Sequence, residues 1–152
     1  MPLIIAGSIA TLIVIVAVVT HEARADLSPE KQAAAASCES AYEAKFPDGP
    51  GIVGGDIYAA TEWRETNAAM VKLGYLTKEE ATLSGEEADA KNHEADALVA
   101  SGGEQMTVLW QRDDQSHAQC IADMQGGKVT STVITELVAP AASPSPSPSP
   151  SK

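Results

Sequence analysis

Three carboxylates and an imidazole lie at helical spacing in the acidic middle of the chain, where they are candidates for metal chemistry. Residues 79–96 hold seven acidic side chains and a single basic one, Lys91. Steps of three and four residues place on one face of a helix Glu86, Asp89, His93 and Asp96. Carboxylate oxygens and an imidazole nitrogen could bind a divalent cation such as calcium or manganese. One helix cannot surround an ion, however, and the same stripe is typical of a solvated helix face.

A second imidazole, that of His117, follows the aspartates Asp113 and Asp114 in the sequence. A turn could bring one carboxylate to this ring as an acid–base pair, although a surface histidine in a hairpin has the same pattern. A small metal-dependent hydrolase that uses His93 or His117 therefore stays an alternative function. No catalytic residue is assigned, and no cofactor is expected beyond a divalent cation.

Two short motifs lack the surroundings that their chemistry needs. Residues 49–54 match GxGxxG, but the dinucleotide-binding motif follows a strand, whereas here a helix is expected before it. We interpret residues 47–55, with four glycines and two prolines, as a loop. Residues 28–31 match SxxK of the penicillin-interacting serine enzymes, whose SDN and KTG elements are absent from the sequence. Ser28 is instead explained as a helix N-cap.

The chain has two cysteines, Cys38 and Cys120, too far apart in sequence for a CxxC motif. We expect a disulfide that joins the first helix to a late strand, since an exported protein can form one. Closing a loop of about 80 residues would stabilise the fold by about 4.5 kcal/mol if chain entropy dominates. Two buried free thiols are the alternative.

Residues 1–25 have the pattern of a targeting segment. Positions 3–19 are uncharged and apolar, a run that is short for a membrane-spanning helix of about 20 residues. Ala-Arg-Ala at 23–25 is a pattern that signal peptidase accepts, and cleavage there would leave Asp26 first. No lysine or arginine precedes the run, which leaves open an uncleaved membrane anchor with the domain outside the cell. Arg24 and Lys31, after the run, leave open the opposite orientation.

The net charge of −11 comes from 21 acidic and 10 basic residues. Cleavage after residue 25 removes one of each sign, so the mature chain keeps the same net charge. Such a chain is repelled by phosphate backbones and anionic lipid surfaces, which excludes nucleic-acid binding. Cationic partners and divalent metals are compatible with it.

The first two thirds of the remaining sequence predict helices. A helix capped by Ser28 should run to about Lys45, and a second should run from Asp56 to Leu73, before Gly74. Capping boxes at residues 77–80 and 84–87 predict a short helix and a longer one that reaches about residue 100.

The last third predicts strands. Alternating apolar residues over 105–112, 116–124 and 128–138, separated by short polar turns, favour an antiparallel meander of three strands. Cys120 then lies on the buried face. The Ser-Pro repeat over 140–152 is typical of a disordered tail.

These elements predict one α+β domain over residues 26–139, with three to four helices packed on a three-stranded sheet. The most consistent function is an exported, non-enzymatic interaction domain whose partner is an unknown protein or component of the cell envelope or extracellular space. The alternative keeps residues 1–25 as a membrane anchor, with the domain outward and the Ser-Pro tail as a spacer.

Overall fold

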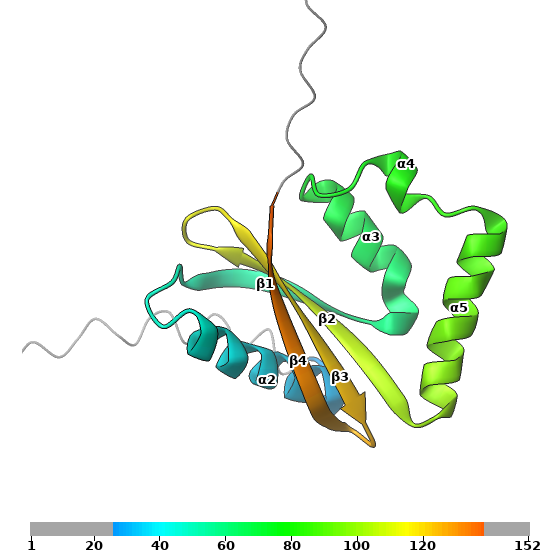
Figure 1. Cartoon of the computed structure of the whole chain (residues 1–152), viewed down its shortest axis with the longest axis horizontal. Helices are drawn as coiled ribbons and strands as arrows, with labels where there is room; N and C mark the ends of the chain where they lie inside the picture. The colour runs from blue at the N-terminus through cyan, green and yellow to red at the C-terminus, as the bar shows by residue number, and fades with distance from the viewer. Residues whose placement is uncertain (1–25, 139–152) are drawn as a thin grey trace, which may run out of the picture.

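The computed structural model describes residues 26–138 as an α+β fold, with helices on both faces of a four-stranded antiparallel sheet (Figure 1). The predicted targeting segment and the Ser-Pro tail lie outside the described residues. In chain order the elements are α2 (Pro29–Lys45), β1 (Ile52–Ala59), the 3₁₀ helix η1 (Ala60–Glu62), α3 (Trp63–Lys72), α4 (Lys78–Ala81), α5 (Gly85–Ala100), β2 (Gly103–Arg112), β3 (His117–Gln125) and β4 (Lys128–Leu137). The strands are neighbours in the order β1-β2-β3-β4, so the sheet is a meander interrupted between β1 and β2 by η1, α3, α4 and α5.

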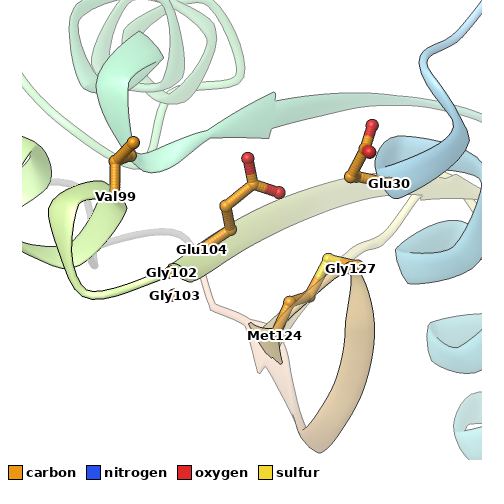
Figure 2. Close-up of a pocket in the computed structure, with 7 residues that line it drawn as sticks. All are labelled: Glu30, Val99, Gly102, Gly103, Glu104, Met124 and Gly127. Carbon is orange, nitrogen blue, oxygen red and sulfur yellow. The ribbon is translucent and has the colours of Figure 1, made fainter.

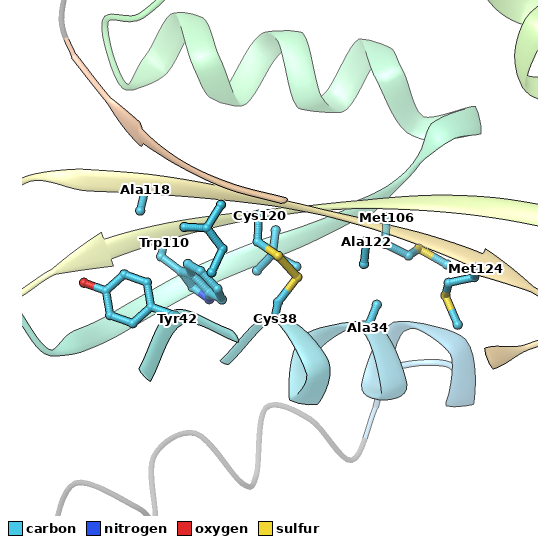
Figure 3. Packing of buried hydrophobic residues seen from close by; sticks show 11 residues of the cluster. Ala34, Cys38, Tyr42, Met106, Trp110, Ala118, Cys120, Ala122 and Met124 are labelled. Carbon is cyan, nitrogen blue, oxygen red and sulfur yellow. A yellow bond between two sulfur atoms is a disulfide. The ribbon is translucent and has the colours of Figure 1, made fainter. Parts of the chain in front are cut away.

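The helix α2 covers one face of the sheet and buries its stripe of small residues there. Ser28 caps it as predicted, with its hydroxyl oxygen accepting the Lys31 N–H at 3.3 Å. The small side chains of Ala34 and Cys38 allow the helix to approach the sheet closely. Opposite them lie the alternating inward positions of β2 and β3, which are Met106, Val108, Trp110, Ala118, Cys120, Ala122 and Met124 (Figure 3).

A disulfide crosses this core and joins α2 to β3. The Cα atoms of Cys38 and Cys120 are 6.0 Å apart, and both side chains are fully buried. In the strand register Cys120 lies opposite Val108 on β2 and Ile134 on β4, directly beneath the helix. The predicted pairing of the two cysteines is therefore confirmed, and the bond lies in the middle of the core.

The prediction of three strands is wrong, because β1 adds a fourth. It occupies part of the expected loop and the start of the helix expected from Asp56, so α3 begins only at Trp63. Gly55 pairs with Trp110 of β2, and a Cβ atom at this glycine would lie 2.5 Å from the carbonyl oxygen of Leu109. Glycine permits this close approach but carries no strand preference of its own. The backbone hydrogen bonds to a strand some 50 residues later therefore decide the conformation, and no local pattern shows them.

The later helix boundaries follow the sequence signals. Gly74 adopts a positive φ of 81° and donates its N–H to the Val71 carbonyl at 3.0 Å, which ends α3 as expected. Both predicted capping boxes are present, at Thr77 for the single turn of α4 and at Ser84 for α5. The helices α3, α4 and α5 form a second layer on the face of the sheet opposite α2, where α3 contacts β1 and α5 contacts β2 (Figure 1).

Candidate functional site

A pocket of about 770 Å³ lies between the second helical layer and the sheet, and we call it the helix–sheet pocket. Its volume falls in the range of about 300–1,000 Å³ that is typical of small-molecule sites. It is lined by Ala59, Ala60, Trp63, Thr66, Asn67, Leu76, Glu80, Leu83, Lys91, Glu94, Ala95, Ala97, Leu98, Gln105 and Thr107. The sheet contributes Gln105 and Thr107 from β2 and Ala59 from the end of β1, and the other residues come from η1 and from the helical layer.

The pocket exists because the two faces of β2 have different compositions. Met106 and Val108 point into the core beneath α2, so the alternation of the strand turns Gln105 and Thr107 to the other face. The helix above them, α5, buries only Ala95 among its sixteen residues. Since alanine side chains fill little volume, α5 can lie over the sheet without closing the space between them.

A side-chain cluster joins α3 to the middle of α5 at the pocket wall. The indole Nε1–H of Trp63 donates to Asn92 Oδ1 at 3.1 Å, and Arg64 Nη1 donates to the same oxygen at 3.2 Å. The guanidinium carbon of Arg64 also lies 4.2 Å from the centroid of the Trp63 ring. This cation–π contact and the two hydrogen bonds fix the position of the ring that lines the pocket.

The turn that leads into Trp63 is held by an ion pair from the opposite layer. Lys31 Nζ on α2 lies 2.6 Å from Glu62 Oε2, which also accepts the Ala59 N–H at 2.7 Å. Burial by itself would raise the pKa of Glu62, but the hydrogen bonds from Lys31 and Ala59 outweigh it and lower the pKa. The two layers are thus connected where β1 turns into η1.

The polar groups of the pocket hold its parts together. Asn67 Nδ2 donates to the Ala81 carbonyl at 3.2 Å and so joins α3 to α4. Gln105 Nε2 donates to Asp123 Oδ1 at 2.8 Å, and the hydroxyl of Ser131 donates to the other oxygen of Asp123 at 2.7 Å. These contacts link β2, β3 and β4 across the face that forms the floor.

Three charged side chains line the pocket. Lys91 Nζ and Glu94 Oε2 form an ion pair of 3.0 Å on α5. Glu80 Oε2 accepts the Thr77 N–H at 2.8 Å, and the Thr77 hydroxyl accepts the Glu80 N–H at 3.1 Å. Hydrogen bonds from the backbone and side chain of Thr77 lower the pKa of Glu80. The pocket therefore has two carboxylates and one ammonium group, with Glu80 the carboxylate that the lysine does not pair.

The four residues predicted as a metal stripe lie on the exposed side of α5. Asp89, His93 and Asp96 line a shallow hollow of about 420 Å³ together with Asn92, Ala97 and Ala100, and Glu86 is exposed one turn away. Within residues 26–138 no group of three or more His, Cys, Asp or Glu side chains is arranged to hold a metal ion. Metal binding by this stripe stays a prediction.

The imidazole of His117 is paired with a tyrosine. Its Nδ1 shares a hydrogen bond of 3.0 Å with the hydroxyl of Tyr75, from the loop before α4, and the two rings meet edge to face. Asp114, one of the two aspartates considered as its acidic partner, instead accepts the Ser116 N–H at 3.0 Å and lies 3.9 Å from the Arg112 guanidinium. The tertiary structure thus gives His117 a partner that is 42 positions away.

A smaller pocket, of about 160 Å³, lies where α5 turns into β2 (Figure 2). Its lining includes Glu30, Glu104 and Met124, with Gly102 and Gly103 at the turn. This volume is below the usual range for ligand sites, so the helix–sheet pocket is the better candidate.

Sequence reasoning missed the helix–sheet pocket. The capping box at 77–80 did locate Glu80, but no sequence signal placed it near β2.

Comparison of the chain with protein-family models, with curated proteins and with solved structures finds no match in any of the three. Among residues 26–138, no helix is long and apolar enough to cross a membrane.

Proposed function

We propose that the protein is an exported binding protein that takes a small, partly apolar ligand into the helix–sheet pocket. The observation that carries this proposal is the pocket itself, in which the apolar side chains of Trp63, Leu83 and Leu98 face a polar floor. A concave site with apolar walls and a few polar groups is the usual form of a small-molecule site. Binding is favoured over catalysis because Asn67 and Gln105 are engaged in hydrogen bonds that hold the pocket together.

The cysteine pairing supports the exported location. A disulfide is consistent with an extracytoplasmic environment, since reducing compartments keep thiols free. Release after cleavage at residue 25 is our first proposal, and retention through the apolar run at 3–19 is the second. In both cases the same pocket would meet ligands outside the cytoplasm.

A substitution on the pocket floor tests the proposal. Thr107 lies on β2, and the strand register places Thr135 of β4 on the same face of the sheet but outside the pocket lining. Thr107→Trp would put an indole ring into the pocket, and Thr135→Trp is the matched control because it adds the same side chain to an exposed strand position. Both positions lie in strands, where aromatic side chains are favoured.

The assay is titration with Nile red, a neutral dye that fluoresces in apolar surroundings, using protein purified as its host exports it. We expect one dye molecule to bind per chain, Thr107→Trp to remove most of the binding and Thr135→Trp to preserve it. Circular dichroism checks that both variants keep the fold. Equal binding by all three proteins, or the absence of dye binding to the unmodified protein, would contradict the proposal.

A further inference from the structure

We infer that the ligand of the helix–sheet pocket is an amphiphilic organic cation, with its apolar body against Trp63, Leu83 and Leu98 and its ammonium or guanidinium group at Glu80. This inference rests on the proposed function and adds the chemical class of the ligand. It combines two properties of the pocket, its apolar walls and the excess of negative charge at one side.

The apolar part of the ligand follows from the lining. Eight of the lining residues are alanine, leucine or tryptophan, and they come from the end of β1, from η1, α3 and α5, and from the segments that flank α4. Leu76, Leu83 and Leu98 are each half-buried, so part of their apolar surface is open to a ligand. Burying such surface is favourable by about 25 cal/mol per Å², so an aliphatic or aromatic group gains binding free energy when it enters the pocket.

The charge of the ligand follows from the acidic groups around the pocket. Lys91 is neutralised by Glu94, so the carboxylate of Glu80 determines the net charge of the lining. Glu79, Glu86 and Glu87 on the neighbouring turns outnumber the nearby bases Lys78 and Arg64, and the whole chain carries −11. A cation is therefore attracted to the pocket and an anion repelled from it.

The position of Glu80 suits it to receive a cation. It is the third residue of α4, where the capping box fixes its side chain through Oε2. Within the described residues Oε1 makes no hydrogen bond, so it can accept one from an ammonium group. The hydrogen bonds from Thr77 also lower the pKa of Glu80, so the carboxylate stays ionised in mildly acidic solution.

The test compares three ligands that share one eight-carbon chain and differ only in the head group: octylamine, octanol and octanoate. Each competes with Nile red for the unmodified protein, and isothermal calorimetry gives the affinity independently. We expect octylamine to bind roughly fivefold more tightly than octanol, and octanoate to bind most weakly. Added salt should reduce this difference because it screens the charge.

A pair of adjacent variants locates the effect. Glu80→Gln removes the charge but keeps an oxygen that can accept the Thr77 N–H, since glutamine also completes a capping box. Glu79→Gln makes the same charge change one position away, at an exposed residue that does not line the pocket. Glu80→Gln should lose the octylamine preference and leave octanol binding unchanged, whereas Glu79→Gln should keep both.

The outcomes distinguish a wrong ligand class from a wrong proposed function. If octanol and octanoate bind as tightly as octylamine, the pocket binds ligands but the cationic class is wrong. Equal losses in both variants would overturn the assignment of Glu80. If neither Nile red nor any probe binds, the proposed function itself fails. A capped tripeptide of one lysine between two leucines identifies the source of the cation, because tighter binding than that of octylamine points to a basic peptide.

Discussion

The two adjacent glycines of β1 have opposite surroundings, which makes them a sensitive test of the fourth strand. A Cβ atom added at Gly55 would lie 2.5 Å from the Leu109 carbonyl oxygen and 2.9 Å from Cδ1 of Trp110. At Gly54 the same atom would meet nothing within 4 Å. Neither glycine has a positive φ, so alanine fits the backbone conformation at both. The perturbation is therefore Gly55→Ala, with Gly54→Ala as the control.

The expected magnitude follows from these contacts. The oxygen that Gly55→Ala would contact belongs to the backbone of a strand in the middle of the sheet and cannot rotate away, so the strands must separate. Overpacking of this kind costs about 1–3 kcal/mol. Replacing glycine by alanine also restricts the unfolded chain, which raises the free energy of unfolding by about 0.4–1 kcal/mol. We expect Gly55→Ala to lower the free energy of unfolding by about 1–2 kcal/mol, and Gly54→Ala to raise it by up to about 1 kcal/mol.

Urea unfolding followed by far-ultraviolet circular dichroism measures both effects. The midpoint should fall for Gly55→Ala and should stay or rise for Gly54→Ala, with the same denaturant dependence in all three proteins. If both variants shift the midpoint equally, β1 does not approach β2 as described. If residues 56–73 instead formed one helix, the sequence-based expectation, Gly55 would lie in the loop before it and Gly55→Ala should not lower the midpoint.

Three further predictions concern the N-terminus, the disulfide in the core and the floor of the pocket. In protein purified from its exporting host, intact mass should show a chain that begins after Ala25, with Cys38 and Cys120 blocked until reduction. Replacing both cysteines by alanine should lower the free energy of unfolding by about 4.5 kcal/mol, and a loss below about 1 kcal/mol would show that the cross-link matters little. Two hydrogen bonds lower the pKa of Asp123 from its usual 3.8, so its contribution to stability is present above about pH 4 and is lost as the pH falls further. Asp123→Asn should therefore reduce the slope of stability against pH in that acidic range, measured by urea titrations, and an unchanged slope would contradict this.

The parts of the fold that the sequence predicted are those governed by neighbouring residues. The N-cap at Ser28, the glycine after α3 and the two capping boxes each act within one helical turn, so their residue types suffice to predict the helix ends. The alternation from residue 105 onward predicted the side chains of β2 and β3 that are buried beneath α2, but it did not predict the burial of Leu109 on the other face of β2. The disulfide followed from the presence of two cysteines, one on a predicted buried face, in a chain with an export signal.

The candidate pocket could not be predicted in this way, because its residues are brought together by contacts between distant segments. Glu80 and Thr107 lie on elements far apart in the sequence. The relative position of these elements depends on the pairing of β1 with β2 and on the hydrogen bond between the side chains of Trp63 and Asn92. His117 shows the same effect, since its sequence neighbours suggested an aspartate and the fold supplies Tyr75.

The sequence by itself thus determined the fold class, the strong negative charge, most helix ends and the disulfide partners, since each depends on composition or on spacing within one element. Only the tertiary structure decided that residues 52–59 form a strand, because a glycine-rich segment acquires its conformation from the partner it pairs with. It also decided that a helical layer rich in alanine lies over the polar face of β2 and leaves a pocket there. Packing between distant residues creates that space, and no single stretch of the sequence contains it.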